Sequence, residues 1–171
     1  LAVAAVADTA KPTSAQAIAD LHALGVRTLM LTGDNTPTAR AIAQQVGIDE
    51  ARGDQLPEDK LAAIESKLAP GTRVGMVGDG INDAPALARA DIGFAMGAAG
   101  TGTAIETADV ALMEHDLRKI GIFLRLSRAT RRVLVQNIVL ALGIKAVFLA
   151  LAVTGNATLW MAVFADVGAS L

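Results

Sequence analysis

Residues 134–153 form a run of twenty residues in which Lys145 carries the only formal charge. About 20 apolar residues in a helix are enough to cross the hydrocarbon core of a bilayer. A turn sequence at residues 154–156 follows, and residues 157–171 begin a second apolar segment. The pattern predicts a transmembrane helical hairpin whose second helix is cut short, with a buried hairpin in a soluble core as the alternative.

Basic residues are concentrated directly before this apolar run. Residues 121–171 contain five Lys or Arg and one acid, whereas residues 1–120 contain ten basic and sixteen acidic residues. Four of the five precede the run, namely Arg125, Arg128, Arg131 and Arg132. Because the cytoplasmic flanks of membrane helices carry an excess of Lys and Arg, this side of the hairpin is predicted to be cytoplasmic. The change in composition predicts two parts, residues 1–120 and residues 121–171.

The first part alternates between short apolar runs and amphipathic segments. Strands are predicted at residues 1–6, 26–32, 73–77, 92–96 and 109–113, and helices at residues 13–24, 35–47, 56–69, 82–90 and 103–108. Strands that alternate with helices predict a parallel sheet covered on both faces, and fully apolar strands fit burial on both sides. The predicted fold class is therefore α/β, a Rossmann-like parallel sheet followed by the transmembrane hairpin.

The amino-acid composition excludes several kinds of site and partner. The sequence has no cysteine, which excludes disulfides and thiolate metal sites within these 171 residues. Aromatic residues make up 3% of the chain, too few to favour a surface that stacks nucleic-acid bases, so no nucleic-acid partner is expected. Leu1 and Leu171 both lie inside apolar runs, and the chain is therefore expected to be a piece of a longer protein.

Polar clusters follow three of the predicted strands at the point where each ends. They are Asp8 and Thr9 after the first strand, Thr32, Gly33, Asp34 and Asn35 after the second, and Asp79, Gly80, Asn82 and Asp83 after the third. Ligands of open parallel sheets bind beyond the carboxyl ends of the strands. If the three strands are neighbours, this edge combines carboxylates that suit Mg²⁺ with glycine amides and helix N-termini that suit phosphate. The alternative is that the acids only cap helices.

Lys60 occupies an unusual position for a lysine, in the first turn of the predicted helix 56–69. Its neighbours Glu58 and Asp59 follow the preference for acids at a helix N-terminus, whereas Lys60 opposes the helix dipole. A lysine placed there can reach back to a phosphoryl oxygen. A solvated surface lysine is the alternative.

Three short motifs carry a resemblance to a known family: TGDN at 32–35, PEDK at 57–60 and GDGINDAPAL at 78–87. In this order and spacing they resemble the phosphorylation domain of P-type ATPases, which belong to the haloacid-dehalogenase-like superfamily. The sequences DTAKP (8–12), MGAAGTGTAIETADVAL (96–112) and QNIVLALGIK (136–145) extend the resemblance over essentially the whole chain.

The resemblance implies that Mg²⁺ and ATP are cofactors and that catalysis proceeds through an aspartyl phosphate. The family's nucleophile lies in a D-K-T-G-T motif, which this sequence lacks. The nucleotide-binding domain is absent as well, and ATP would be bound together with that domain. The chain by itself is therefore expected to be inactive in ATP hydrolysis.

The resemblance also implies roles for the polar residues. Thr32, followed in the motif by Gly33 and Asp34, contacts the transferred phosphoryl group. Lys60 neutralises the charge of that group, and Asp8 lies near the bound nucleotide.

The resemblance implies further roles for the third cluster. Asp79 would bind Mg²⁺, and Asn82 and Asp83 would hold the geometry of the metal and the phosphate. Two positions depart from the pattern of the family. Gly102 stands where relatives often have an aspartate, so it receives no binding role, and Lys11 replaces an arginine with retention of charge.

Two ionisable residues occur in the predicted membrane segments. Lys145 lies ten residues before Gly155 in the turn, and Asp166 lies eleven residues after it. At about 1.5 Å per residue both are roughly 15–17 Å from the turn, near the centre of a bilayer. Ionisable residues at that depth are costly and usually functional, although a purely structural ion pair is the alternative.

Lys145 and Asp166 also indicate which ion the protein transports. A lysine here and an aspartate in ADVGAS (165–170) resemble the zinc, cadmium and lead exporters. A carboxylate oxygen suits a borderline divalent ion better than Cu(I), which prefers sulfur. Asp166 is predicted to ligate the transported ion and Lys145 to act as its counter-ion. The expected partners are a divalent heavy-metal ion and the lipid bilayer.

The resulting hypothesis is an ATP-driven exporter of Zn²⁺, Cd²⁺ or Pb²⁺, a multi-pass protein of a bacterial plasma (inner) membrane with its catalytic domain in the cytoplasm. Its alternatives are a Cu⁺-exporting ATPase, a membrane-anchored phosphatase of the same superfamily, and a non-catalytic regulator that binds nucleotide or Mg²⁺. His22 and His115 are each isolated in the sequence and are predicted to be surface or half-buried residues, not metal ligands.

Overall fold

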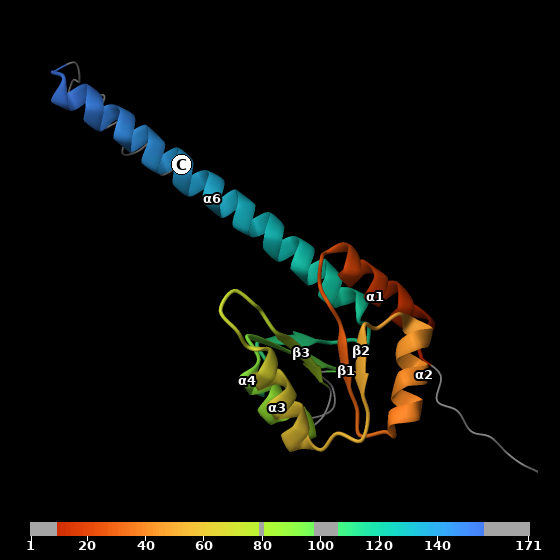
Figure 1. Ribbon diagram of the computed structural model, residues 1–171. Helices are drawn as coiled ribbons and strands as arrows, with labels where there is room; N and C mark the ends of the chain where they lie inside the picture. The colour runs from red at the N-terminus through yellow and green to blue at the C-terminus, as the bar shows by residue number, and fades with distance from the viewer. Residues whose placement is uncertain (1–9, 79–80, 98–105, 156–171) are drawn as a thin grey trace, which may run out of the picture. The chain divides into compact units, whose positions relative to one another are not determined.

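The computed structural model describes residues 10–78, 81–97 and 106–155 (Figure 1). The chain divides into two compact units, Leu1–Ile122 and Phe123–Leu171, and each is considered by itself. The first unit contains short strands and helices in alternation. The second consists, over the described residues, of most of one long helix.

In chain order the elements of the first unit are α1 (Pro12–Ala23), β1 (Leu29–Leu31), α2 (Thr36–Val46), β2 (Glu50–Arg52), α3 (Pro57–Lys67), β3 (Gly75–Gly78), the 3₁₀ turn η1 (Ile81–Asp83), α4 (Ala84–Arg89), β4 (Ile92–Met96) and β5 (Val110–Leu112). Each predicted element within the described ranges is found, with shifts of a few residues at the ends. The predicted strand 1–6 and most of the predicted helix 103–108 lie outside the described residues. Strand β2 was not predicted.

All strand pairings are parallel. Leu29 of β1 pairs with Glu50 of β2, and β3 pairs with β4, which pairs with β5. The predicted α/β class with parallel sheets is therefore confirmed. The described strands form two sheets, β1–β2 and β3–β4–β5, so the condition that strands 26–32 and 73–77 are neighbours is not met among them. Apolar runs identify strands, but they carry no information about which strands exchange hydrogen bonds.

The helices pack beside the two sheets. Helices α3 and α4 contact each other, and α4 packs on β3 and β4, while α1 and α2 lie together next to β1 and β2 (Figure 1). A buried hydrophobic cluster connects α3, α4 and β3. It consists of Ile64 of α3, Met76 of β3, and Ala86 and Leu87 of α4. This core fixes α3 and α4 relative to the carboxyl end of β3, where the third polar cluster begins.

Three aspartates connect neighbouring strands at the amino ends of the strands. Each directly precedes a strand and accepts a hydrogen bond from a backbone N–H of the neighbouring strand or the residues leading into it. The bonds are Thr28 N to Asp49 Oδ2 at 2.7 Å, Val74 N to Asp91 Oδ2 at 2.8 Å, and Gly93 N to Asp109 Oδ2 at 2.8 Å. These acids are structural, and they lie at the opposite ends of the strands from the predicted site.

Acid should weaken these connections. The backbone N–H of Val74, assisted by Arg73, lowers the pKa of Asp91 below its ordinary value. A lowered pKa in the folded state contributes stability above the ordinary value, and this contribution is lost as the pH falls through the lowered pKa. Below about pH 4, the protection of the β3 and β4 amides against exchange, relative to an unstructured chain at the same pH, is therefore expected to fall in the whole protein.

The variant Asp91→Asn keeps an acceptor oxygen but has no charge to lose. The protection of its β3 and β4 amides, referred to an unstructured chain at the same pH, should fall less in acid than that of the wild type. Glu58→Gln, which removes an exposed carboxylate from α3, is the control and should behave as the wild type does. Equal acid dependence in Asp91→Asn and wild type would show that this carboxylate does not carry the effect.

Helix α6, Arg118–Val153, is continuous over 36 residues. Its first turn is fixed by Asp116, which accepts from the backbone N–H of Arg118 at 3.0 Å and pairs with the Arg118 guanidinium at 2.7 Å. That guanidinium and the backbone bond hold the pKa of Asp116 at about 2. Within the described residues α6 alone is long and apolar enough to cross a membrane, and its most apolar stretch has no buried side chain. The second predicted span lies outside the described residues.

Candidate active site

Lys60 and Asp83 meet at the carboxyl end of β3. The Lys60 Nζ lies 2.7 Å from Asp83 Oδ1, and the two side chains are 16% and 12% exposed. Pro57 opens α3, and Asp59 accepts a hydrogen bond from the N–H of Leu56 at 3.0 Å, which fixes the first turn that carries Lys60. The structure therefore does not leave Lys60 as a solvated surface lysine: it is a partly buried cation held on a carboxylate.

Asp83 is positioned by a close approach to the strand. A Cβ added to Gly78 would lie 2.8 Å from the Asp83 Cβ and 3.0 Å from its Oδ2. Only glycine at the end of β3 leaves room for this carboxylate. Asp83 precedes α4 but makes no side-chain hydrogen bond to that helix, so helix capping does not explain its position.

A second polar group follows β1. The Thr32 hydroxyl donates to Asp34 Oδ2 at 3.0 Å and accepts from the Asp34 N–H at 3.1 Å. The side chain that caps α2 belongs to Asn35, whose Oδ1 accepts from the Thr38 N–H at 2.9 Å. Asp34 is thus engaged with Thr32 and not with the helix, and the capping alternative fails for it as it does for Asp83.

The remaining predicted site residues divide into two groups. Asn82 is exposed in η1 beside Asp83, and Gly33 is exposed in the loop after β1. Lys145 lies in α6, in the second unit. Asp8, Asp79 and Asp166 lie outside the described residues. Among the residues that are described, no three His, Asp or Glu side chains gather as a metal site would require, and His22 and His115 are both exposed.

His22 has a structural partner. Its Nε2 lies 3.0 Å from Asp49 Oδ2 and 3.2 Å from the Thr28 hydroxyl, at the amino ends of β1 and β2. The His115 ring lies over Gly97, where any side chain would collide with it. Both positions agree with the prediction of surface histidines.

The loop from Gly53 to Gln55 also belongs to this region, and the sequence reasoning missed it. The Gln55 N–H donates to the Thr32 carbonyl at 3.0 Å, and the Asp54 N–H donates to the Asp34 carbonyl at 2.6 Å. The loop thus connects the segment after β1 with the start of α3. Gly and Asp are each frequent in turns, so the Gly53–Asp54 pair was the available hint in the sequence.

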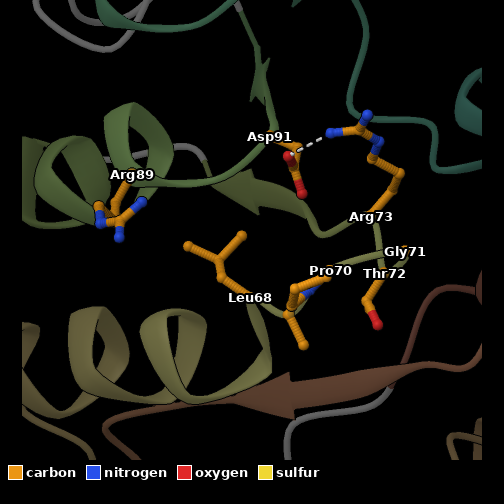
Figure 2. Close-up of a pocket in the computed structure, with 8 residues that line it drawn as sticks. Leu68, Pro70, Gly71, Thr72, Arg73, Arg89 and Asp91 are labelled. Carbon is orange, nitrogen blue, oxygen red and sulfur yellow. Dashed lines mark hydrogen bonds and ion pairs between the residues drawn. The ribbon is translucent and has the colours of Figure 1, made fainter.

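A shallow pocket lies elsewhere. It is lined by residues 68–73 with Arg89 and Asp91. Figure 2 shows the Arg73 guanidinium turned toward Asp91, to which it is bound at 3.0 Å, with Arg89 on the other side of Leu68. The pocket adjoins the amino ends of β3 and β4 and includes none of the predicted catalytic residues, so it is not the candidate site.

Residues 1–91 match the haloacid dehalogenase-like hydrolase family, to which the chain therefore belongs. A probable cadmium-transporting ATPase of Listeria monocytogenes is 52% identical over 172 residues, which cover 100% of this chain and 24% of that protein. A zinc-transporting ATPase of Synechocystis is 53% identical over 169 residues, 97% of this chain and 23% of that protein.

The fold agrees with these relatives. The crystal structure of a zinc-transporting PIB-type ATPase in the E2.Pi state matches with a TM-score of 0.88 and 48% identity, and covers 95% of this chain and 26% of that one. The predicted resemblance to zinc- and cadmium-transporting P-type ATPases is confirmed along the chain. The chain spans about a quarter of the length of these relatives.

Proposed function

We propose that this chain works within an ATP-driven P-type pump that exports Zn²⁺, Cd²⁺ or Pb²⁺ through an aspartyl-phosphate intermediate. Residues 1–120 form the C-terminal part of its phosphorylation domain, and residues 121–171 form the helix that leads into the membrane and the last two transmembrane helices. The observation that carries the proposal is the Lys60–Asp83 pair at the end of β3, in a chain 52% identical over its length to a cadmium-transporting ATPase.

Phosphoryl transfer depends on positioning and on stabilisation of the developing charge. Lys60 supplies a positive charge that its contact with Asp83 holds at the end of β3. The Thr32 hydroxyl is held at the end of β1 by its two bonds to Asp34, where it contacts the phosphoryl group. The nucleophilic aspartate and most of the nucleotide site belong to parts of the pump beyond these 171 residues, although Asp8 lies near the nucleotide.

The donor set fits Mg²⁺. This ion is usually bound through one or two carboxylates together with substrate phosphate. Asp79 would supply one carboxylate, and Asp83 with Asn82 would support the geometry from η1. A bound Mg²⁺ would offset the charge of the phosphoryl oxygens.

Helix α6 is long and apolar enough to cross a membrane, and this supports a proposal for the location of the whole protein. We infer a multi-pass protein of a bacterial plasma membrane with residues 1–120 on the cytoplasmic side. The arginines at 125, 128, 131 and 132 support this orientation because basic residues accumulate on the cytoplasmic flank of a span. Exposed apolar side chains along α6, such as Val139 and Leu140, are suited to lipid.

The proposal is tested by incubating the whole pump with radiolabelled ATP and Mg²⁺. An acid-stable, hydroxylamine-sensitive phosphoprotein should form in the presence of Zn²⁺, Cd²⁺ or Pb²⁺ and decay when the metal is chelated. Absence of any metal-dependent phosphoprotein would refute the proposed function.

Gly78→Ala should disturb this reaction without changing a catalytic group. Its methyl would collide with Asp83 and displace the carboxylate that holds Lys60. Misplacement of a catalytic group by about 1 Å can cost roughly 100-fold, and a loss of this order in the rate of phosphoprotein formation is expected.

Gly75→Ala in the same strand is the matched control. A Cβ there would meet the Ile92 Cγ2 at 3.5 Å, an ordinary contact, and the rate should stay near that of the wild type. Similar rates for the two variants would argue against the packing of Asp83 on Gly78 as a requirement for catalysis.

A further inference from the structure

Asp54 adopts an unusual backbone conformation in the loop between β2 and α3. Its φ is +56°, the one positive value among the described residues other than glycine. Such a conformation is uncommon for side-chain-bearing residues, and Asp and Asn tolerate it best. A residue held in this way is fixed by its surroundings, and the contacts of Asp54 identify what holds it.

Both the main chain and the side chain of Asp54 bind the segment that follows Thr32. The Asp54 N–H donates to the Asp34 carbonyl at 2.6 Å. Asp54 Oδ2 accepts from the Thr36 N–H at 3.1 Å and from the Thr36 hydroxyl at 2.7 Å. Asp54 therefore binds the loop after β1 at two residues, Asp34 and Thr36, which lie on either side of Asn35.

The residues next to Asp54 bring its loop into close contact with the segment after β1. The Thr32 N–H donates to the Arg52 carbonyl at 3.1 Å, and the Gln55 N–H donates to the Thr32 carbonyl at 3.0 Å. A Cβ on Gly53 would lie 2.5 Å from the Thr36 Cα, so no side chain fits between them. Both backbone groups of Thr32 are thus hydrogen-bonded, the N–H to Arg52 at the end of β2 and the carbonyl to Gln55 in the loop that contains Asp54.

The same loop leads directly into the helix that carries Lys60. Leu56 donates its N–H to Asp59 at 3.0 Å, and its carbonyl accepts from the Lys60 N–H at 3.1 Å. The N–H groups of Asp54, Gln55, Leu56 and Lys60 are therefore all held by hydrogen bonds. A shift of Asp54 would move Thr32 relative to Lys60 even though neither side chain is altered.

We propose that Asp54 is a positioning residue for phosphoryl transfer, whose carboxylate sets the Thr32 loop relative to the helix that carries Lys60. The proposal rests on the function proposed above. Asp54 touches neither Lys60 nor Asp83 in the described contacts, and it acts through Thr36 and the backbone of residues 32–36. Its loss should impair handling of the phosphoryl group more than binding of ATP.

Three variants of the whole pump separate the carboxylate from the backbone conformation. Asp54→Gly accepts the positive φ but has no acceptor, Asp54→Ala lacks the acceptor and is strained, and Asp54→Asn keeps both an acceptor oxygen and tolerance of this φ. Thr36→Val removes the hydroxyl bond from the other side and leaves the Thr36 N–H in place.

The measurement is phosphorylation of the metal-free pump by inorganic phosphate, together with the KM for ATP and kcat. Asp54→Gly is expected to lower phosphorylation by inorganic phosphate and kcat by about tenfold while the KM for ATP changes by less than about twofold. Asp54→Asn should recover most of the loss. Thr36→Val should have a smaller effect, and the double variant with Asp54→Gly should be no worse than Asp54→Gly alone, because the two residues share one interaction.

Two results would overturn the inference. One is wild-type phosphorylation by inorganic phosphate in Asp54→Gly. The other is an equal loss in Asp54→Asn and Asp54→Gly, since the acceptor oxygen would then be irrelevant. A wild-type pump that forms no phosphoprotein from ATP or inorganic phosphate would instead refute the proposed function, and this inference with it.

Discussion

Replacing Lys60 with methionine is expected to lower formation of the phosphorylated pump by about 10²- to 10³-fold, the usual cost of removing one group that stabilises charge in a transition state. Methionine preserves most of the length and apolar stem of lysine, so the change removes mainly the charge. Two consequences add up at the site. The phosphoryl oxygens lose a cation, and Asp83 loses the partner that lies 2.7 Å from it in a largely enclosed position.

Lys67→Met is the matched control, because Lys67 lies on the same helix. Its Nζ lies 3.2 Å from Glu50 Oε2, but the two side chains are 45% and 43% exposed. Exposed pairs of this kind contribute little, and a change of less than about twofold in phosphorylation is expected. If Lys60→Met also stayed within about twofold of wild type, Lys60 could not be the group that neutralises the phosphoryl charge.

Replacing Asp166 with alanine is expected to remove the response to metal while sparing the phosphorylation chemistry. The spacing of Asp166 from the turn predicts that this carboxylate lies near the centre of the bilayer, where an ionisable group is usually retained for function. Its oxygen suits a borderline divalent ion, and loss of a ligand should lower metal-stimulated ATP hydrolysis by about 100-fold or more. Phosphorylation by inorganic phosphate without metal should persist, because the catalytic edge is unchanged.

Lys145 sharpens this prediction. If Lys145 is the counter-ion of Asp166, it should matter only while Asp166 is charged. Lys145→Gln should therefore slow metal-stimulated turnover, and the double variant should be no worse than Asp166→Ala, as expected for two residues that act as one unit. Retention of zinc-stimulated ATP hydrolysis in Asp166→Ala would contradict the assignment of the transported-ion site.

The helices and the polar segments that follow the strands could be predicted from the sequence better than the pairing of the strands. Polar residues directly after apolar strands indicated a candidate site, and Lys60 was conspicuous because it opposes a helix dipole. The partner of Lys60 was not predictable, since the 2.7 Å contact with Asp83 joins residues that lie 23 positions apart. It depends on how α3 and α4 pack around Leu87 and Ile64.

Strand β2 and the conformation of Asp54 show why other features could not be predicted from the sequence. Glu50, Ala51 and Arg52 have no apolar alternation, and they form a strand because the edge of β1 offers parallel hydrogen bonds. The positive φ of Asp54 results from its bonds to Asp34 and Thr36. Both features arise from tertiary contacts and not from local propensity.

ATP-dependent metal uptake by inside-out membrane vesicles that contain the whole pump distinguishes an exporter of divalent heavy metals from its alternatives. We expect accumulation of Zn²⁺, Cd²⁺ or Pb²⁺ that requires ATP and Mg²⁺ and is abolished by Lys60→Met. Accumulation of Cu⁺ in place of these divalent ions, or no ATP-dependent accumulation of any metal, would contradict this expectation.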